Sequence, residues 1–224
     1  MTGQTVGVWC NGNTVDFDST ALGSIPGTPA INSYMNITKF PVLITSPARC
    51  GSTALLRKIA FDYNLKEFGE PHALVSPKVF WKLTEFSKIK KRSDYVIKVM
   101  SGLFDYYHSY YNYNLDNFFT IRLRRRNIIE QCASYYIART INKWHSTIHD
   151  FTSLDFIALD YNEIKLSTDL ILQANIKNEA INHNFNLELY YEDLDLSNPD
   201  LVKNSKPKNY QELLDIIKAD IDQR

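Results

Sequence analysis

The stretch FPVLITSPARCGSTALL, residues 40–56, decides the fold of this 224-residue chain. It opens with a short apolar run from Phe40 to Ile44, continues through a polar turn from Thr45 to Ser52, and enters a helical pattern from Thr53 to about Tyr63. A continuous apolar run of this length is typical of a strand buried on both faces of a parallel sheet. The stretch therefore predicts a strand, a loop and a helix in direct succession.

The same rhythm of strand and helix recurs along the chain. The later elements that we predict are strands at residues 95–100, 118–123 and 187–191 and helices at about residues 127–144, 162–182 and 210–221. Strands that alternate with helices indicate an α/β protein, a three-layer sandwich in which helices flank a central, mainly parallel sheet. Ligand sites of such sheets lie beyond the carboxyl ends of the strands.

Residues 1–38 differ in composition from the rest and are rich in Gly, Asn, Ser and Thr. An Asn11-Gly12 pair between two short strand-like segments is a strong hairpin signal. We treat residues 1–38 as an N-terminal appendage and residues 39–224 as a single domain, a size that one hydrophobic core supports.

The overall composition excludes several classes of protein. Hydrophobic residues make up 44% and charged residues 22%, which excludes disordered, collagen-like and disulfide-scaffold chains. The three cysteines are far apart and support neither a disulfide framework nor a zinc site. We expect no membrane span and no secretion signal, and hence a cytoplasmic location.

The formal net charge of zero hides an uneven distribution. Residues 1–38 carry two acids and no bases, residues 39–150 carry 18 bases and 9 acids, and residues 151–224 carry 7 bases and 14 acids. A basic middle inside a neutral protein indicates a specific anionic ligand more than wholesale binding to nucleic acid. The alternative that composition leaves open is that the oppositely charged parts attract each other.

The loop after the first predicted strand has the features of a phosphate cradle. Gly51 permits close approach of the backbone, Ser52 and Thr53 supply hydroxyl donors, and the N–H groups of the new helix face the loop. Arg49 adds a permanent charge with a forked donor geometry. A capped helix start, with Ser52 or Thr53 as N-cap, is the alternative. The GxxxxGK[ST] pattern of nucleoside triphosphatases is absent, which disfavours an ATPase or GTPase.

A second cluster of anion-binding residues follows the third predicted strand. Four arginines, Arg122, Arg124, Arg125 and Arg126, stand within five positions, and Ser134 lies eight residues after the last of them. An arginine that folds back over the first two helical turns can share an anion with that hydroxyl, about 12 Å away along the axis. A solvated arginine face is the alternative. Two anion sites at neighbouring strand ends predict a ligand with two separated anionic groups.

These residues resemble a known family, the sulfotransferases that use 3′-phosphoadenosine 5′-phosphosulfate. The run Arg49-Cys50-Gly51-Ser52-Thr53 resembles their 5′-phosphosulfate loop, with Cys50 in place of the usual Ser. The segment from Arg126 to Ser134 resembles their 3′-phosphate motif, an Arg and a Ser separated by seven residues.

Among the branches of that family, the chain looks most similar to the bacterial trehalose-type sulfotransferases. The segment Phe68-Gly69-Glu70-Pro71-His72 is similar to the Gly-Glu-Pro segment in which that branch carries its catalytic glutamate. The resemblance covers about residues 40–145 and, weakly, residues 190–194. It implies a P-loop-like sulfotransferase fold.

The resemblance also implies how the donor 3′-phosphoadenosine 5′-phosphosulfate is held. The residues that would cradle its 5′-phosphosulfate are Arg49, Cys50, Gly51, Ser52 and Thr53. Arg126 and Ser134 would bind the 3′-phosphate, which distinguishes this donor from ATP. The implied reaction is in-line transfer of the sulfuryl group to a hydroxyl of a carbohydrate or small-metabolite acceptor, without a metal.

Glu70 is the implied catalytic base, because it would take the proton of the acceptor hydroxyl as the oxygen attacks sulfur. Pro71 would hold its backbone rigid, and His72 is the fallback base. Arg49 is expected to stabilise the charge that develops on the leaving group. Lys98, on the second predicted strand, is left without a role.

Other functions remain open from the sequence. One is a non-catalytic nucleotide-binding protein of the same fold, and another, less favoured, is a small-molecule or nucleotide kinase. Nucleic-acid binding is disfavoured because the last third of the chain is acidic and the net charge is zero. A homodimer is compatible with the sequence, which does not define the oligomeric state or the acceptor.

Overall fold

The computed structural model describes residues 35–70, 93–105, 114–141, 156–194 and 206–224, together with the backbone of residues 7–10 and 13–16. The strands are β1 (Gly7–Cys10), β2 (Asn13–Asp16), β3 (Val42–Ser46), β4 (Lys66–Glu67), β5 (Tyr95–Met100), β6 (Phe119–Arg124) and β7 (Leu187–Tyr190). The α-helices are α1 (Ser52–Asp62), α4 (Ile128–Thr140), α5 (Tyr161–Ala180) and α6 (Tyr210–Asp222). Short 3-10 helices are η2 (Ser101–Leu103), η3 (Leu115–Asn117) and η4 (Tyr191–Asp193).

A five-stranded sheet with the order β4-β5-β3-β6-β7 forms the centre of the molecule. Every neighbouring pair of its strands is parallel. Val42 at the start of β3 pairs with Val96 of β5 on one side and Phe119 of β6 on the other. After β3, the chain first adds β4 and β5 on one side of β3 and then adds β6 and β7 on the other side. The direction in which strands are added therefore reverses at β3. Ligands of parallel sheets bind at such switch points.

Helix α1 covers one face of this sheet. Its side chains Leu55, Leu56 and Ile59 are fully buried and pack against strand residues that include Val42 and Ile44. Positions 55, 56 and 59 lie on one side of a helix, because residues four apart come one above the other. All five residues of β3 are buried, as expected of a central strand covered on both faces.

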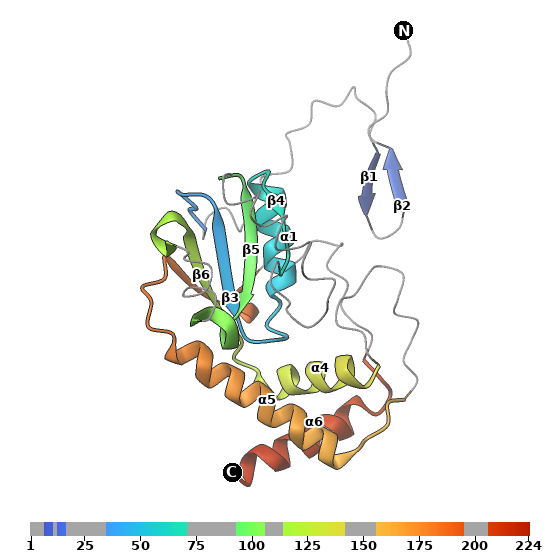
Figure 1. Cartoon of the computed structure of the whole chain (residues 1–224). Helices are drawn as coiled ribbons and strands as arrows, with labels where there is room; N and C mark the ends of the chain where they lie inside the picture. The colour runs from blue at the N-terminus through green and yellow to red at the C-terminus, as the bar shows by residue number, and fades with distance from the viewer. Residues whose placement is uncertain are drawn as a thin grey trace, which may run out of the picture.

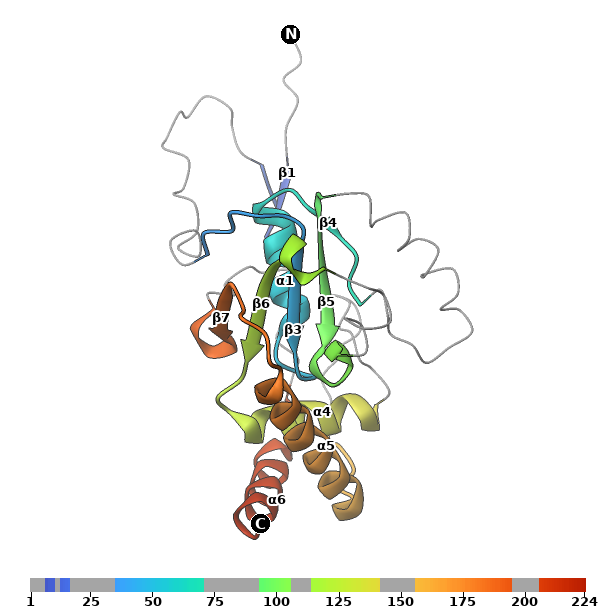
Figure 2. The same cartoon turned by 60° about the vertical axis from the view of Figure 1, so that its left-hand side comes forward.

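The opposite face and the carboxyl edge are covered by later parts of the chain. Leu43 and Ile97 face Phe118 and Ile181, the residue directly after α5. Helices α4, α5 and α6 share a separate apolar cluster that includes Tyr136, and they form a layer beyond the carboxyl ends of the strands (Figures 1 and 2). This layer of helices therefore lies next to the sheet edge that carries the predicted motifs.

The prediction of an α/β protein with a central parallel sheet is confirmed. The four predicted strands correspond to β3, β5, β6 and β7 with shifts of at most two residues at either end, and the predicted helices to α1, α4, α5 and α6. The predicted hairpin is present as the antiparallel pair β1–β2. Strand β4 was not predicted, because two residues are too short to carry an apolar pattern. No helix within the described ranges is long and apolar enough to span a membrane.

Candidate functional site

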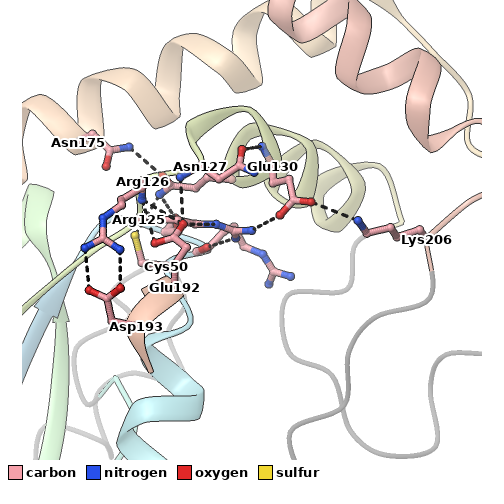
Figure 3. Close-up of polar contacts among 12 residues, drawn as sticks. Cys50, Arg125, Arg126, Asn127, Glu130, Asn175, Glu192, Asp193 and Lys206 are labelled. Atoms are coloured by element: carbon pink, nitrogen blue, oxygen red, sulfur yellow. Dashed lines mark hydrogen bonds and ion pairs between the residues drawn. The ribbon is translucent and has the colours of Figure 1, made fainter. Parts of the chain in front are cut away.

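The predicted anion-binding residues lie in and beside the loops that meet at the carboxyl edge of the sheet, with Arg122 and Arg124 in β6 and Ser134 in α4. These loops follow β3, β6 and β7, and the segment after β4 reaches the same edge beside β5. The parallel arrangement places all of these strand ends on one side, so residues far apart in sequence become neighbours. Figure 3 shows the polar contacts at the β6 and β7 ends.

The loop between β3 and α1 has an unusual backbone. Arg49 and Gly51 both have positive φ, 59° and 75°. Gly51 is the N-cap of α1, and among the described residues no side chain caps that helix, so the alternative of Ser52 or Thr53 as N-cap is wrong. The carbonyl of Ala48 accepts a hydrogen bond from Gln131 Nε2 at 2.7 Å. Helix α4 thus holds the loop by a side-chain hydrogen bond to the backbone of the loop.

Gly51 is required for a second reason besides its φ. A Cβ atom at this position would lie 2.3 Å from Cδ2 of Tyr191. The ring of Tyr191, in η4, therefore packs directly on the glycine of the loop. The segment that follows β7 therefore covers the loop at Gly51.

The two predicted anion motifs touch through one hydrogen bond. Arg49 Nε donates to Ser134 Oγ at 2.9 Å, across 85 positions of sequence. Burial of the Arg49 guanidinium lowers its pKa, and the nearby charge of Arg125 acts in the same direction. The side chain of the first motif and the hydroxyl of the second thus form one cluster, whereas the sequence predicted two separate anion sites and paired Ser134 with Arg126.

Cys50 faces the interior of the protein. It is fully buried, and burial raises its pKa to about 12. Gln131 Nε2 lies 3.3 Å from its Sγ, and the Gln131 oxygen accepts from Asn175 of α5 at 3.1 Å. Cys50 therefore anchors the loop in the core rather than contacting a ligand.

Lys98 connects the predicted base to the predicted loop. Its Nζ lies 2.6 Å from Thr53 Oγ1 and 2.8 Å from Glu70 Oε1. Lys98 is 6% exposed, whereas the Glu70 side chain is 24% exposed. Sequence reasoning left Lys98 without a role, although a lysine in the otherwise apolar strand 95–100 is a signal of one. His72, the fallback base, lies outside the described residues.

The arginine run divides into residues with different partners. Arg122 is buried and donates to the carbonyl of Ile181 at 2.8 Å. Arg124 Nε binds Glu179 at 2.7 Å, and its other nitrogens contact Glu179 and Glu188. These two arginines tie β6 to α5 and β7. The prediction that the whole run presents positive charge to a ligand is wrong for them, because acidic residues of the chain pair with them.

Arg126 is the exposed member of the run. Its Nη1 and Nη2 bind the two carboxylate oxygens of Asp193 at 2.5 and 2.7 Å (Figure 3). This fork raises the pKa of Arg126 and lowers that of Asp193, as a close opposite charge does. Ser134, its predicted partner, instead accepts from Arg49.

Glu192 caps the start of α4. Its carboxylate accepts from the backbone N–H groups of Arg126 and Asn127 at 3.0 to 3.1 Å. Burial acts to raise the pKa of Glu192, but these backbone hydrogen bonds outweigh it and the net shift is downward. Together, Tyr191, Glu192 and Asp193 contact the loop, the helix start and Arg126. Sequence reasoning found only a weak signal in this segment.

Comparisons with known proteins identify no family. No protein-family model matches the sequence, and no curated protein matches it. Among solved structures, the chain is similar to the apo SH3-kinase fragment of tight junction protein 3, with 12% identity and a TM-score of 0.33. That match covers 81% of this chain and 57% of the other, so this chain spans little more than half its length. A similarity at this level supports no conclusion about fold or function.

Substitution of Gly51 by Ala tests the close contact with Tyr191. Gly69 also has a positive φ, 56°, but its added Cβ meets no atom of the described residues within 4 Å, so it is a matched control. Both substitutions should lose about 1–2 kcal/mol from the backbone conformation. Gly51→Ala should lose a further 1–3 kcal/mol, roughly, from overlap with the ring. Urea unfolding measures the loss of stability in both variants, and equal losses would show that overlap with the Tyr191 ring does not affect stability.

Glu192→Gln tests the charge at the start of α4. Because the folded protein lowers the pKa of Glu192, its carboxylate adds stability above the unfolded value of about 4.3, and that contribution disappears as pH falls through the folded pKa. At pH 7 the wild type should be more stable than Glu192→Gln by about 0.3–1 kcal/mol. The difference should shrink as the pH falls below about 4.3 and vanish once the pH is below the folded pKa. Urea midpoints across this range measure it, and a constant difference would contradict the charge effect.

Proposed function

We propose that this chain is a sulfotransferase that moves a sulfuryl group from 3′-phosphoadenosine 5′-phosphosulfate to a hydroxyl of a carbohydrate or small metabolite. The hydrogen bond from Arg49 to Ser134 supports this most strongly. It brings together the two segments that resemble the 5′ and 3′ phosphate motifs of the family. We likewise propose that the parallel sheet is the core of a P-loop-like sulfotransferase fold.

The proposed donor lies across the ends of β3 and β6. Gly51, Ser52 and Thr53 open helix α1, whose first N–H groups have no intrahelical acceptors and suit an anion. Arg49 and Lys98 supply two cations beside this helix start. A phosphosulfate bound there is close to the Thr53 hydroxyl and to both charges. The 3′-phosphate is left to Arg126, whose side chain is exposed at the end of β6.

In the proposed reaction the acceptor oxygen attacks sulfur in line with the bridging oxygen of the donor. The new S–O bond forms as the bridging S–O bond breaks, and the acceptor proton passes to the Glu70 carboxylate. Adenosine 3′,5′-bisphosphate leaves, and Lys98 and Arg49 stabilise the negative charge on its 5′-phosphate. The contacts of Lys98 with Thr53 and Glu70 support this proposed role.

Calorimetric titration with adenosine 3′,5′-bisphosphate, with adenosine 5′-monophosphate as control, tests the donor site. The bisphosphate should bind more tightly than the monophosphate, because only it has the 3′-phosphate. In Arg126→Ala the ratio of bisphosphate to monophosphate affinity should fall about 10- to 100-fold, the effect of one charge-assisted contact. If the folded wild type binds neither nucleotide, the proposal is wrong.

Glu70→Gln separates an enzyme from a binding protein. The amide keeps the size of the carboxylate but cannot take a proton. Turnover of the donor with hydroxyl acceptors should fall about 10²- to 10⁴-fold, and bisphosphate affinity should stay within a factor of about three. Release of bisphosphate from the donor measures turnover. Unchanged turnover would remove Glu70 from the mechanism, and binding without turnover in the wild type would favour the non-catalytic alternative.

Asp193→Asn tests whether the Arg126–Asp193 pair competes with the 3′-phosphate. Both side chains of the pair are more than half exposed, so the pair itself is weak. Its removal should strengthen bisphosphate binding by up to about fivefold and leave monophosphate binding unchanged. Asp169→Asn, which removes a distant contact to Arg224, is the matched control. Weaker bisphosphate binding in Asp193→Asn would show that Asp193 orients Arg126 instead.

A further inference from the structure

Arg125 lies at the junction of three parts of the site. Its Nη1 donates to the carbonyl of Arg49 at 2.9 Å, and its Nη2 binds Glu130 of α4 at 3.1 Å (Figure 3). Its guanidinium carbon lies 4.9 Å from the centre of the Tyr191 ring, a cation–π distance. Only 11% of its side chain is exposed. One side chain thus contacts the loop, the helix and η4.

The contact with the Arg49 carbonyl has a specific consequence. Arg49 has a left-handed backbone, φ 59°, which residues other than glycine adopt only where their surroundings hold them. In that conformation its carbonyl points to Arg125 and its side chain reaches Ser134. Both of these hydrogen bonds therefore depend on the left-handed turn at Arg49.

We propose that Arg125 is a positioning residue for the anion loop: it holds the left-handed turn at Arg49 and does not bind the ligand itself. This inference rests on the proposed function for the nature of the ligand. It assigns different roles to two adjacent arginines. Arg125 acts through the backbone of the loop at the 5′ end of the donor, whereas Arg126 is exposed and faces the 3′ end.

The buried thiol of Cys50, next to Arg49, reports on the loop without any ligand. In a protein with Cys10→Ser and Cys132→Ala, Cys50 is the single cysteine. Its labelling by a thiol reagent requires the loop to open, because Cys50 is fully buried. Arg125→Met should speed labelling about 10- to 100-fold, the effect of losing a charged donor to a backbone carbonyl. Arg126→Met, the matched control, should change it less than twofold.

Global stability is measured in urea on the same variants, so that labelling through complete unfolding is subtracted. Arg125→Lys provides a second test where Arg125→Met folds poorly. Lysine keeps one donor but loses the fork and the planar stack, so its labelling rate should lie between those of the wild type and Arg125→Met. Equal corrected rates for wild type, Arg125→Lys and Arg125→Met would overturn the inference.

Nucleotide affinity supplies the readout that a merely structural role does not predict. Because the proposed effect is at the 5′ end, Arg125→Met should weaken adenosine 5′-monophosphate and adenosine 3′,5′-bisphosphate by the same factor, about tenfold or more. Arg126→Met should weaken only the bisphosphate. A loss in Arg125→Met that is confined to the bisphosphate would overturn the inference. If the wild type binds neither nucleotide, the proposed function fails, and the Cys50 labelling rates alone decide the role of Arg125.

Discussion

The turn between β3 and α1 depends on hydrogen bonds to two successive backbone carbonyls. Gln131 binds the carbonyl of Ala48 and Arg125 binds that of Arg49, both from the start of α4 or the residues just before it. With these carbonyls bound on one side, the backbone turns left-handed at Arg49 and again at Gly51. The side chain of Arg49 and the open end of α1 take their positions from this turn. The candidate site is therefore held by a helix that begins more than 70 residues later in the chain.

The uneven charge of the sequence has a structural explanation at the end of β6. Arg122 and Arg124 pair with Glu179 and Glu188, and Arg126 pairs with Asp193. All three acids belong to the acidic last third of the chain. Attraction between oppositely charged parts, the alternative that composition left open, thus contributes at all four arginines, because Arg125 Nε also lies 4.0 Å from Glu192. The indication of an anionic ligand rests instead on Arg49 and Lys98, which lie beside the helix start.

The sequence predicted the elements of the fold better than the contacts of the site. Apolar or largely apolar runs of five or six residues marked β3, β5 and β6, because a strand buried on both faces is mostly apolar. Two motifs at neighbouring strand ends were expected to lie near each other, but Ser134 was paired with Arg126 and not with Arg49, to which it is hydrogen-bonded. The positions of Lys98 and Tyr191 did not follow, because they depend on which strands become neighbours and on how η4 folds back. Local pattern carries no information on either.

The two ends of the site differ in the burial of their contacts, so that one end keeps a fixed geometry and the other has contacts that a ligand can replace. At the β3 end the partners are buried: Gln131 is fully buried, and Arg125 nearly so. Loss of a partner there leaves a buried polar group unpaired, which is costly, so this half keeps one geometry. At the β6 end, Arg126 and Asp193 are exposed, and water replaces either partner at little cost. A ligand with two anionic groups would thus meet a preformed cradle at one end and, at the other, an arginine that exchanges one carboxylate for a phosphate.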